Sequence, residues 1–500
     1  MAADANGLNH STSKAGSGIA GLDEVLAGGF PEHRVHLVEG SPGTGKTTLA
    51  LQFLLDGVRH GEPVLYVTLS ETSDELWAVA RSHGWSLDGV TLYELMPTEA
   101  SLRPNERYTI LHPSEVELDE TIGAVLDVVE RLRPSRVVFD SLAELRLMTR
   151  DPFRYRREVL ALKQFFAGRR CTVLLLDDVH DAGEGVQSIA HSVVWLEQTA
   201  PAYGSERRRL HVIKLRGVGY RGGYHDSVIR TGGLVVFPRL VATEHRVESV
   251  VGSASSGVDE LDALLGGGLH WGTSALLIGP AGVGKSVIAT QYVRAAAERG
   301  ESGAVYVFDE SVATFRARAK GLDLDIDRYV EDGRVTLQQL APAELSPGEF
   351  DHLVRQSVEA RGARIVVIDS LNGYLNAMAE ERPVLVQLHE LLSYLSGRGV
   401  LTLLTVAQHG LVGEQVQSPL DISYLTDTVV LLRYFEAAGR LRQAISVVKN
   451  RLGAHEHSIR QLRLGPGVRV GQPLRAFQGV LAGAPTYLGS EQALFENGDD

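Results

Sequence analysis

Residues 40–47 read GSPGTGKT, and the chain repeats the pattern 239 positions later as GPAGVGKS over residues 279–286. Each stretch follows a short apolar run and precedes a segment whose apolar residues have helical spacing. Between a strand and a helix, Gly-x-x-x-x-Gly-Lys-Ser/Thr forms a loop whose backbone N–H groups cradle phosphate oxygens. Because this context occurs twice, the sequence predicts two phosphate-binding loops rather than two ordinary glycine turns.

The two loops belong to two copies of one domain. Residues 17–31 (SGIAGLDEVLAGGFP) align without a gap with residues 256–270 (SGVDELDALLGGGLH). After the loops we pair Tyr66–Thr72 with Tyr306–Ser311, Arg136–Ser141 with Arg364–Ser370, and Ile213–Gly217 with Val448–Gly453. Self-similarity of this length indicates an internal duplication.

Domain boundaries follow from the repeat and from a change in composition. The chain becomes polar and rich in small residues near 240–252, after the strand-like run GGLVVFPRL. We therefore expect a flexible N-terminus over 1–15, one domain over 16–245, a second over 252–490, and a short acidic tail over 491–500.

Each copy alternates short apolar runs with amphipathic stretches. In the first copy the runs are RVHLVEG, PVLYVTLS, RVVFDS, CTVLLLDD and SVVWLEQ, and TTLALQFLLDGVRHG has helical spacing. The runs do not alternate between apolar and polar residues, which is typical of strands that crossover helices bury on both faces. The predicted fold class is α/β, with two tandem P-loop domains around mostly parallel central sheets.

Composition narrows the class of protein. A chain of 500 residues with 44% hydrophobic and 22% charged residues is typical of a globular protein with several domains. We find no long apolar run and no basic N-terminus followed by one, so we expect no membrane contact, no secretory signal and a cytoplasmic location. The net charge of −13 disfavours a main role in coating nucleic acid. The single cysteine, Cys171, lies in an apolar run and is expected to be a buried thiol.

The loop residues predict contacts with ATP. Lys46 and Lys285 would reach the β and γ phosphates, with Mg²⁺ as the accompanying ion. The expected ATP-binding residues are Gly43, Thr44, Gly45, Lys46, Thr47 and Thr48 in the first copy and Gly282, Val283, Gly284, Lys285, Ser286 and Val287 in the second.

Four residues are candidates for the metal site. Thr47 and Ser286 would each offer a hydroxyl to Mg²⁺. Asp140 and Asp369 end apolar strands, where a carboxylate emerges beside the loop and can hold the metal's water shell. An aspartate after a strand can also cap a helix, and that would be the better interpretation of either residue alone. The pairing with a phosphate loop favours the metal.

Acidic residues after the next predicted strand are candidates for orienting an attacking water. In the second copy they are Asp309 and Glu310. The matching positions of the first copy are Ser70 and Glu71, so one of the two is a serine instead of an acid. A catalytic base must lie within hydrogen-bond reach of the water that it activates. The alternative is that these residues are solvated acids that cap the following helix. Because the two sets differ, we expect the two sites to differ in rate.

At this point the sequence resembles a known family. The tandem loops, the SGxxxLDxxLxGG lead-in, the acids after the second strand, the Asp-Ser strand ends and the late Lys-x-Arg pairs are similar to KaiC, a circadian-clock ATPase and autokinase, and more broadly to the RecA-like ATPases. The resemblance covers most of residues 15–490. It implies two RecA-like domains that stack as two rings of six subunits, with ATP between neighbouring subunits. It also implies that the first ring mainly hydrolyses ATP and that the second can phosphorylate itself.

The resemblance assigns a contact across the subunit boundary to two pairs of cations. Lys214 and Arg216, and Lys449 and Arg451, match the pair that reaches the neighbour's γ phosphate. Without the resemblance they would be a solvated strand edge. The basic stretch 205–221 (SERRRLHVIKLRGVGYR) would suit nucleic acid, but we expect it to line the subunit boundary.

The segment 421–434 (DISYLTDTVVLLRY) bears on whether the chain can phosphorylate itself, because the family's phosphoacceptors lie in the matching segment. Ser423 matches the family's serine acceptor, whereas Tyr424 stands where the family has a threonine. A phenol places its oxygen farther from the backbone, so one geometry cannot serve both residues. We therefore keep Ser423 as the candidate phosphoacceptor, with the equal alternative that Ser423 and Tyr424 are polar interface residues.

The end of the chain also departs from the family. LAGAPTYL (residues 481–488) is similar to the family's closing motif, but only twelve residues follow it. The family's clock version uses a longer tail to bind its activating partner, so the resemblance does not imply that partner here. A KaiB-like protein is a candidate partner. We expect a KaiC-like protein that works outside a full clock.

Three function classes fit these observations. The favoured one is an ATP-hydrolysing ring that signals through its nucleotide and phosphorylation state. The second is a DNA-dependent motor of the RecA or RadA type, which the net charge and the lack of a four-cysteine zinc module disfavour. The third is a nucleotide-gated scaffold whose hydrolysis is vestigial.

Overall fold

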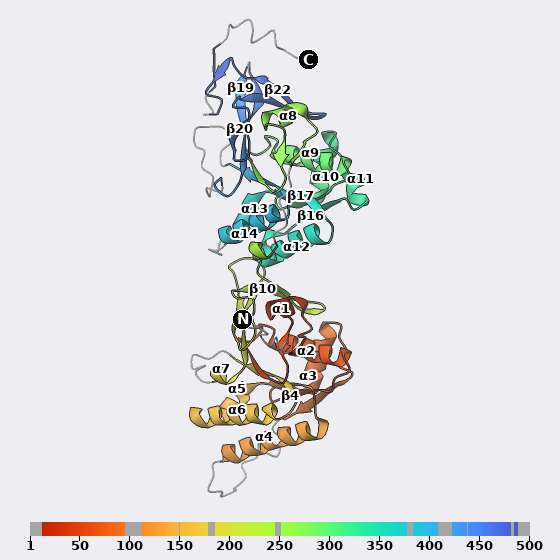
Figure 1. Ribbon diagram of the computed structural model, residues 1–500, viewed down its shortest axis with the longest axis vertical. Coiled ribbons are helices and arrows are strands. Elements are labelled where there is room, and N and C mark those ends of the chain that lie inside the picture. Colours follow the sequence, from red (N-terminus) through yellow and green to blue (C-terminus); the bar gives the residue numbers. More distant parts are fainter. Residues whose placement is uncertain are drawn as a thin grey trace, which may run out of the picture. The chain divides into compact units, whose positions relative to one another are not determined.

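The computed structural model describes residues 13–95, 113–149, 151–178, 186–245, 252–377, 384–408, 423–437, 439–481 and 485–488. The described chain divides into two compact units, one up to Arg239 and one from Leu240 (Figure 1). Among the described helices, none is both long enough and apolar enough to cross a membrane.

The first unit is built on a nine-stranded sheet with helices packed against it (Figure 1). The strands of this sheet are β3 (Val35–Gly40), β4 (Val64–Thr68), β5 (Val90–Glu94), β6 (Arg136–Asp140), β7 (Thr172–Asp177), β8 (Ser192–Thr199), β9 (Arg207–Leu215), β10 (His225–Arg230) and β11 (Gly233–Phe237). The short strands β1 (Lys14–Ala15) and β2 (Phe30–Pro31) form a separate two-stranded sheet. The helices of this unit are α1 (Ala20–Val25), α2 (Lys46–Arg59), α3 (Ser73–Ser82), α4 (Pro113–Leu132), α5 (Leu142–Met148), α6 (Pro152–Ala167) and α7 (Val186–Ile189).

The second unit has a nine-stranded sheet of its own. The strands of this sheet are β14 (Ser274–Gly279), β15 (Ser302–Val307), β16 (Val335–Gln339), β17 (Ala363–Asp369), β18 (Leu401–Ala407), β19 (Thr428–Ala437), β20 (Arg440–Asn450), β21 (Arg460–Gly465) and β22 (Gly467–Pro473). Two further pairs form small sheets of their own, β12 (Ser253–Ala254) with β13 (Leu269–His270) and β23 (Phe477–Gln478) with β24 (Thr486–Tyr487). The helices of this unit are the 3₁₀ turns η1 (Ala242–His245) and η2 (Pro342–Glu344) and the α-helices α8 (Asp259–Leu264), α9 (Lys285–Glu298), α10 (Val312–Gly321), α11 (Asp327–Glu331), α12 (Pro347–Glu359), α13 (Leu371–Ala377) and α14 (Val384–Gly397).

The two large sheets have the same strand order. It is β5-β4-β6-β7-β3-β8-β9-β10-β11 in the first unit and β16-β15-β17-β18-β14-β19-β20-β21-β22 in the second. In each sheet the first six strands of this order run parallel and the last three join antiparallel. The prediction of two tandem α/β P-loop domains with mostly parallel sheets is confirmed.

Each large sheet buries apolar residues on both faces. In the first unit one core gathers around α2 and the other around α4 and α6, and two cores of this kind also form in the second unit. Every residue of β3, β6 and β7 is buried. This two-sided burial explains why the apolar runs of the sequence show no polar alternation.

The sheet register corrects one step of the sequence alignment. Thr68 in β4 and Val307 in β15 occupy the same position, since each lies opposite the aspartate that ends the neighbouring strand. Tyr66 is two residues before this position and Tyr306 only one, so pairing the two tyrosines is wrong. A shift of one residue turns a strand side chain to the other face of the sheet. Tyr306 accordingly hydrogen-bonds Ser357 Oγ at 2.8 Å, in a different core from that of Tyr66.

Phe350 in α12 is the centre of an aromatic cluster in the second unit, and its removal should destabilise that unit. Its ring lies 5.4 Å from Tyr306, 5.6 Å from Phe308 and 5.1 Å from Tyr374, centroid to centroid, and it is fully buried. We expect Phe350→Ala to lower the free energy of unfolding by about 3–5 kcal/mol in urea titrations. The exposed Phe153 is the control, since Phe153→Ala should change it by less than about 0.5 kcal/mol. Equal effects would contradict the cluster's role.

Candidate nucleotide sites

The first loop joins β3 to α2, and the glycine just before the helix has a backbone conformation that other residues rarely adopt. Gly45 has φ of 101°, and a Cβ there would lie 2.9 Å from Ile229 Cδ1. Lys46 begins the helix, and its Nζ donates to the carbonyl oxygens of Gly40 (2.6 Å) and Ser41 (3.2 Å). The loop lysine therefore lies over the loop's own backbone, at the head of the helix where phosphates bind.

The second loop repeats this geometry between β14 and α9. Gly284 has φ of 110°, and a Cβ there would lie 2.6 Å from Leu464 Cδ1. The Nζ of Lys285 donates to the carbonyl oxygens of Gly279 (2.8 Å) and Pro280 (2.7 Å). Burial lowers the pKa of Lys285 to about 8.

The remaining loop residues divide between the site and the core. Gly43 and Gly282 lie within the loop turns with positive φ, and Thr44 Oγ1 donates to the Ser41 carbonyl at 2.8 Å. Thr48 is buried in α2, and Val283 and Val287 belong to the apolar core of the second unit. These last three residues can offer a ligand their backbone groups rather than their side chains.

An aspartate that sequence reasoning missed accompanies the first lysine. Asp178, directly after β7, lies 2.8 Å from Lys46 Nζ. The register of β18 against β14 places Ala407 at this position in the second unit. The doubled aspartate of CTVLLLDD, compared with TVAQ in the second copy, was the available signal.

The expected metal residues of the first unit lie together. Tyr66 donates to Asp140 Oδ2 at 2.5 Å, and the Thr47 hydroxyl is hydrogen-bonded to the same carboxylate. Burial raises the pKa of Asp140, against the opposing effect of these hydrogen bonds. A hydroxyl beside a carboxylate fits Mg²⁺, which prefers oxygen ligands and keeps several waters.

The second unit arranges its metal candidates differently. Asp369 Oδ1 accepts a hydrogen bond from Thr405 Oγ1 at 2.5 Å instead of from a tyrosine. Ser286 follows Lys285 at the start of α9 and is half-buried. The donor types again suit Mg²⁺, since a hydroxyl and a carboxylate are the groups offered.

Among the first unit's acid candidates, Glu71 is the one beside the loop. Its Oε2 is buried and has no hydrogen-bond partner in the described part of the chain. Burial raises its pKa to about 7, the charges of Asp140 and Glu75 act in the same direction, and Lys46 opposes them. Ser70 is exposed at the surface. A carboxyl with this pKa can accept a proton from water at neutral pH.

Both acid candidates of the second unit are already engaged. Asp309 accepts a hydrogen bond from Ser370 Oγ, and Glu310 Oε1 lies 2.7 Å from Arg318 Nη1. Burial raises the pKa of Glu310, and Arg318 is the largest opposing effect. The two acid sets therefore differ in their partners as well as in their residue types.

The candidate boundary cations contact carbonyl oxygens of their own unit. Lys214 Nζ donates to Gln187 and Arg216 Nη2 to Ser188 (2.9 Å). Each pair therefore holds the segment just before β8 or β19. The corresponding contacts in the second unit are Lys449 Nζ to Ser423 and Thr426, both at 2.7 Å, and Arg451 Nη2 to Tyr424 at 2.8 Å.

The candidate acceptor Ser423 lies at the edge of the described residues. It is half-buried, whereas the neighbouring Tyr424 is 56% exposed. Lys449 and Arg451 fix the backbone of this short segment through the contacts above. The sequence segment before Ser423 falls outside the described residues.

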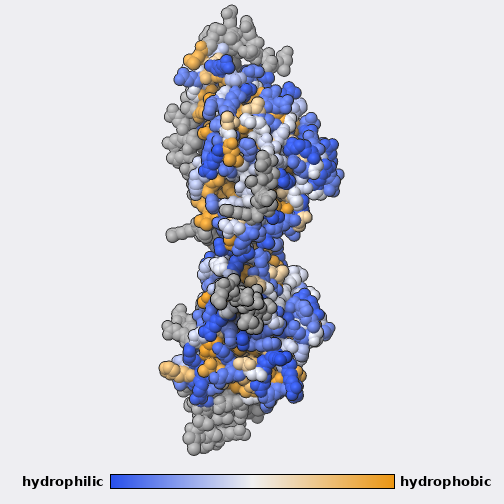
Figure 2. Space-filling model, in the orientation of Figure 1, coloured by the Kyte–Doolittle hydropathy of each residue, from blue (hydrophilic) through white to orange (hydrophobic). Residues whose placement is uncertain are grey.

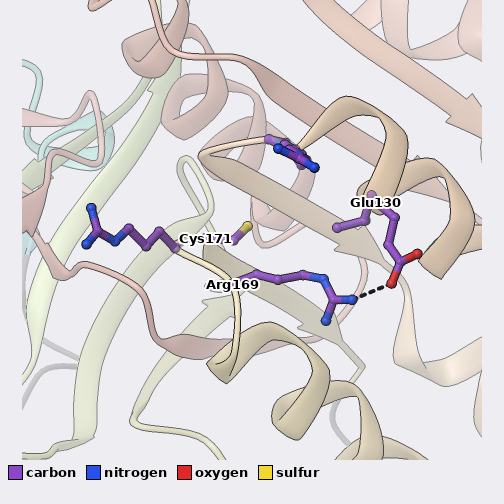
Figure 3. A pocket seen from close by; sticks show the side chains of 7 residues that line it. Glu130, Arg169 and Cys171 are labelled. Carbon is purple, nitrogen blue, oxygen red and sulfur yellow. Dashed lines mark hydrogen bonds and ion pairs between the residues drawn. The ribbon is translucent and has the colours of Figure 1, made fainter.

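A pocket of about 540 Å³ in the first unit lies away from the loop (Figure 3). It is at the amino ends of β6 and β7, the opposite edge of the sheet from the loop, and Cys171 lines it. Cys171 is buried, and burial raises its pKa to about 12, as expected of an unreactive thiol. Arg169 pairs with Glu130 and also donates to the Phe165 carbonyl, which caps the end of α6.

Comparison with known proteins identifies the family. The model of the family described as ATPase: KaiC matches residues 15–241 and 254–473. The chain belongs to the KaiC family. The circadian clock protein KaiC3 of Synechocystis sp. is 27% identical over 488 residues, which cover 95% of each chain. The circadian clock oscillator protein KaiC of Synechococcus elongatus is 27% identical over 503 residues, 97% of this chain and 94% of that relative.

Membership of this family gives the two loops a ligand class and a reaction. The predicted resemblance to KaiC is confirmed, and nucleotide binding and ATPase activity follow from the family together with the two loops.

The raised pKa of Glu71 predicts a pH dependence for ATP turnover at the first site. A base must be deprotonated to act, so turnover should rise roughly tenfold from pH 6 to pH 8, around the pKa of about 7. The measurement is ATP hydrolysis by Lys285→Ala, in which the second loop is disabled. Adding Glu71→Gln should leave a low and flat profile. An unchanged slope in that double variant would assign the titration to another group.

Proposed function

We propose that the chain hydrolyses ATP with Mg²⁺ at both loops as a homo-oligomeric ring, and that the first site is the faster one. The observation that carries this is the half-buried carboxylate of Glu71 near the loop lysine and Asp140, whose Oε2 has no hydrogen-bond partner among the described residues. In this proposal Gly43–Thr48 and Gly282–Val287 hold the triphosphate, chiefly through backbone N–H groups and the two lysines.

The chain's own residues supply positioning and proton transfer. Thr47 with Asp140, and Ser286 with Asp369, would hold a Mg²⁺ ion, which neutralises charge on the phosphates when bound. Glu71 would orient a water and accept its proton. In the second site Asp309 and Glu310 would do the same, from positions that Ser370 and Arg318 restrain.

The ring is proposed from the family and from the cation pairs. Lys214 with Arg216, and Lys449 with Arg451, would contact the neighbour's γ phosphate after leaving the carbonyls that they now hold. Six copies of this chain are the proposed assembly, and a KaiB-like protein is a candidate partner. The basic stretch supports a protein boundary more than nucleic acid, since Arg208 pairs with Glu206 and Arg209 with Glu197.

Serine autophosphorylation at Ser423 is the proposed second activity. The backbone contacts from Lys449 and Arg451 present this residue next to the predicted γ-phosphate ligands. The phosphorylation state would then act as a signal or timing mark. Tyr424 takes no part, because its hydroxyl lies too far along its side chain for the same in-line transfer.

The two loop lysines should contribute unequally to turnover and assembly. We expect each Lys→Ala change to lower turnover at its own site by roughly a hundredfold. Lys46→Ala should reduce both total turnover and native oligomer mass more than Lys285→Ala does. ATPase assays and native mass measurements check this, with the exposed Lys320→Ala as the control. Equal loss of oligomer in both loop variants would refute the division.

Incubation with Mg²⁺ and labelled ATP, followed by phosphopeptide mapping, tests the autokinase. We expect label on the peptide with Ser423, lost in Ser423→Ala and in Glu310→Gln and kept in Tyr424→Phe. Wild-type protein that hydrolyses ATP without acquiring label would leave an ATPase and end the autokinase proposal. Absence of turnover that depends on either loop lysine would favour the nucleotide-gated scaffold.

A further inference from the structure

Helix α10 carries an arginine that contacts the acid of the second site. Arg318 Nη1 lies 2.7 Å from Glu310 Oε1, and the two side chains are 30% and 19% exposed. The guanidinium also lies 5.0 Å from the ring centroid of the buried Phe315, and this cation–π contact helps to hold the arginine in place. The surface seen over α10 and α11 is largely hydrophilic (Figure 2).

The first unit has the same helix without the arginine. Helices α3 and α10 begin after equivalent caps, since Thr72 accepts from the N–H of Glu75 and Ser311 from that of Thr314. Because the two helices start at equivalent residues, positions at the same distance from the cap face the same direction. Arg318 lies seven residues after its cap, Ser311. The residue seven positions after Thr72 in α3 is Val79, which packs against the apolar core of the first unit. It offers Glu71 no charge and no hydrogen bond.

We propose that Arg318 is a positioning residue that restrains Glu310 and thereby slows hydrolysis at the second site. The inference rests on the proposed function of the two acids. An arginine pair holds a carboxylate in one orientation and stabilises its charged form, which makes it a weaker proton acceptor. Glu71 has no such partner in the part of the chain that the structure describes, so its carboxylate can turn to a water. The difference between the sites then comes from a residue outside both loops.

A purely structural reading makes a different prediction. A partly exposed ion pair contributes little to stability, so removing Arg318 should hardly change unfolding. If the arginine served only the fold, its removal would leave turnover at the second site unchanged or lower it. If it restrains Glu310, removal raises that turnover.

The test isolates the second site in Glu71→Gln, which disables the first acid without altering either loop. In this background we expect Arg318→Val to raise kcat for ATP about two- to fivefold, the range set by breaking one such pair, with KM little changed. Arg318→Lys keeps a cation and should stay near the parent. Arg316→Val is the matched control, because Arg316 is on the same helix but pairs with Asp327 at 3.1 Å.

The reciprocal change tests the same rule at the first site. Val79→Arg in the Lys285→Ala background should lower kcat by a similar factor, while Val79→Leu should not, and urea unfolding of both variants detects a damaged core. An unchanged or lower kcat in Arg318→Val, or an equal rise in Arg316→Val, overturns the inference. Wild-type protein without ATP turnover would instead refute the proposed function, so the two failures are distinguishable.

Discussion

A glycine in the left-handed conformation at the head of a helix is the constraint on which both sites depend. Gly45 and Gly284 turn the chain from a buried central strand into α2 and α9, and their φ angles of 101° and 110° lie in the left-handed region that other residues rarely adopt. The turn places each loop lysine over the carbonyls that end the strand. Because the strand is paired on both sides, the site inherits the rigidity of the sheet.

The duplicated scaffold differs most in what surrounds the site. Asp140 at the end of β6 accepts a hydrogen bond from Tyr66. The corresponding Asp369 at the end of β17 accepts one from Thr405. The loop lysine of the first unit has Asp178 beside it, where the second unit has Ala407. Two loops with the same motif can therefore have different electrostatic environments, set by side chains that lie outside the motif.

The sequence was sufficient for the elements and the loops but not for these partners. The apolar runs predicted the central strands because two-sided burial leaves a local signal, and the glycine pattern predicted the turns. Pairing Tyr66 with Tyr306 in the alignment was wrong. The face of the sheet to which a side chain points depends on the strand's register, and the hydrogen bonds to a strand distant in sequence fix that register. Arg318 was not predicted, since a charged residue on a helix is usually solvated and only the three-dimensional structure shows its partner.

The two lysines show how burial can divide the work between the sites. Lys46 is balanced by a carboxylate 2.8 Å away, whereas Lys285 is 7% exposed and lacks that partner, and burial lowers its pKa to about 8. The charge of Asp369 opposes this effect of burial only in part. A buried cation that is not in an ion pair gains more from an arriving phosphate than one already paired. Under the proposed function, this difference would favour tighter holding of triphosphate in the second unit and easier release in the first. Together with the restrained Glu310, it is consistent with a first site that turns over and a second that retains its nucleotide.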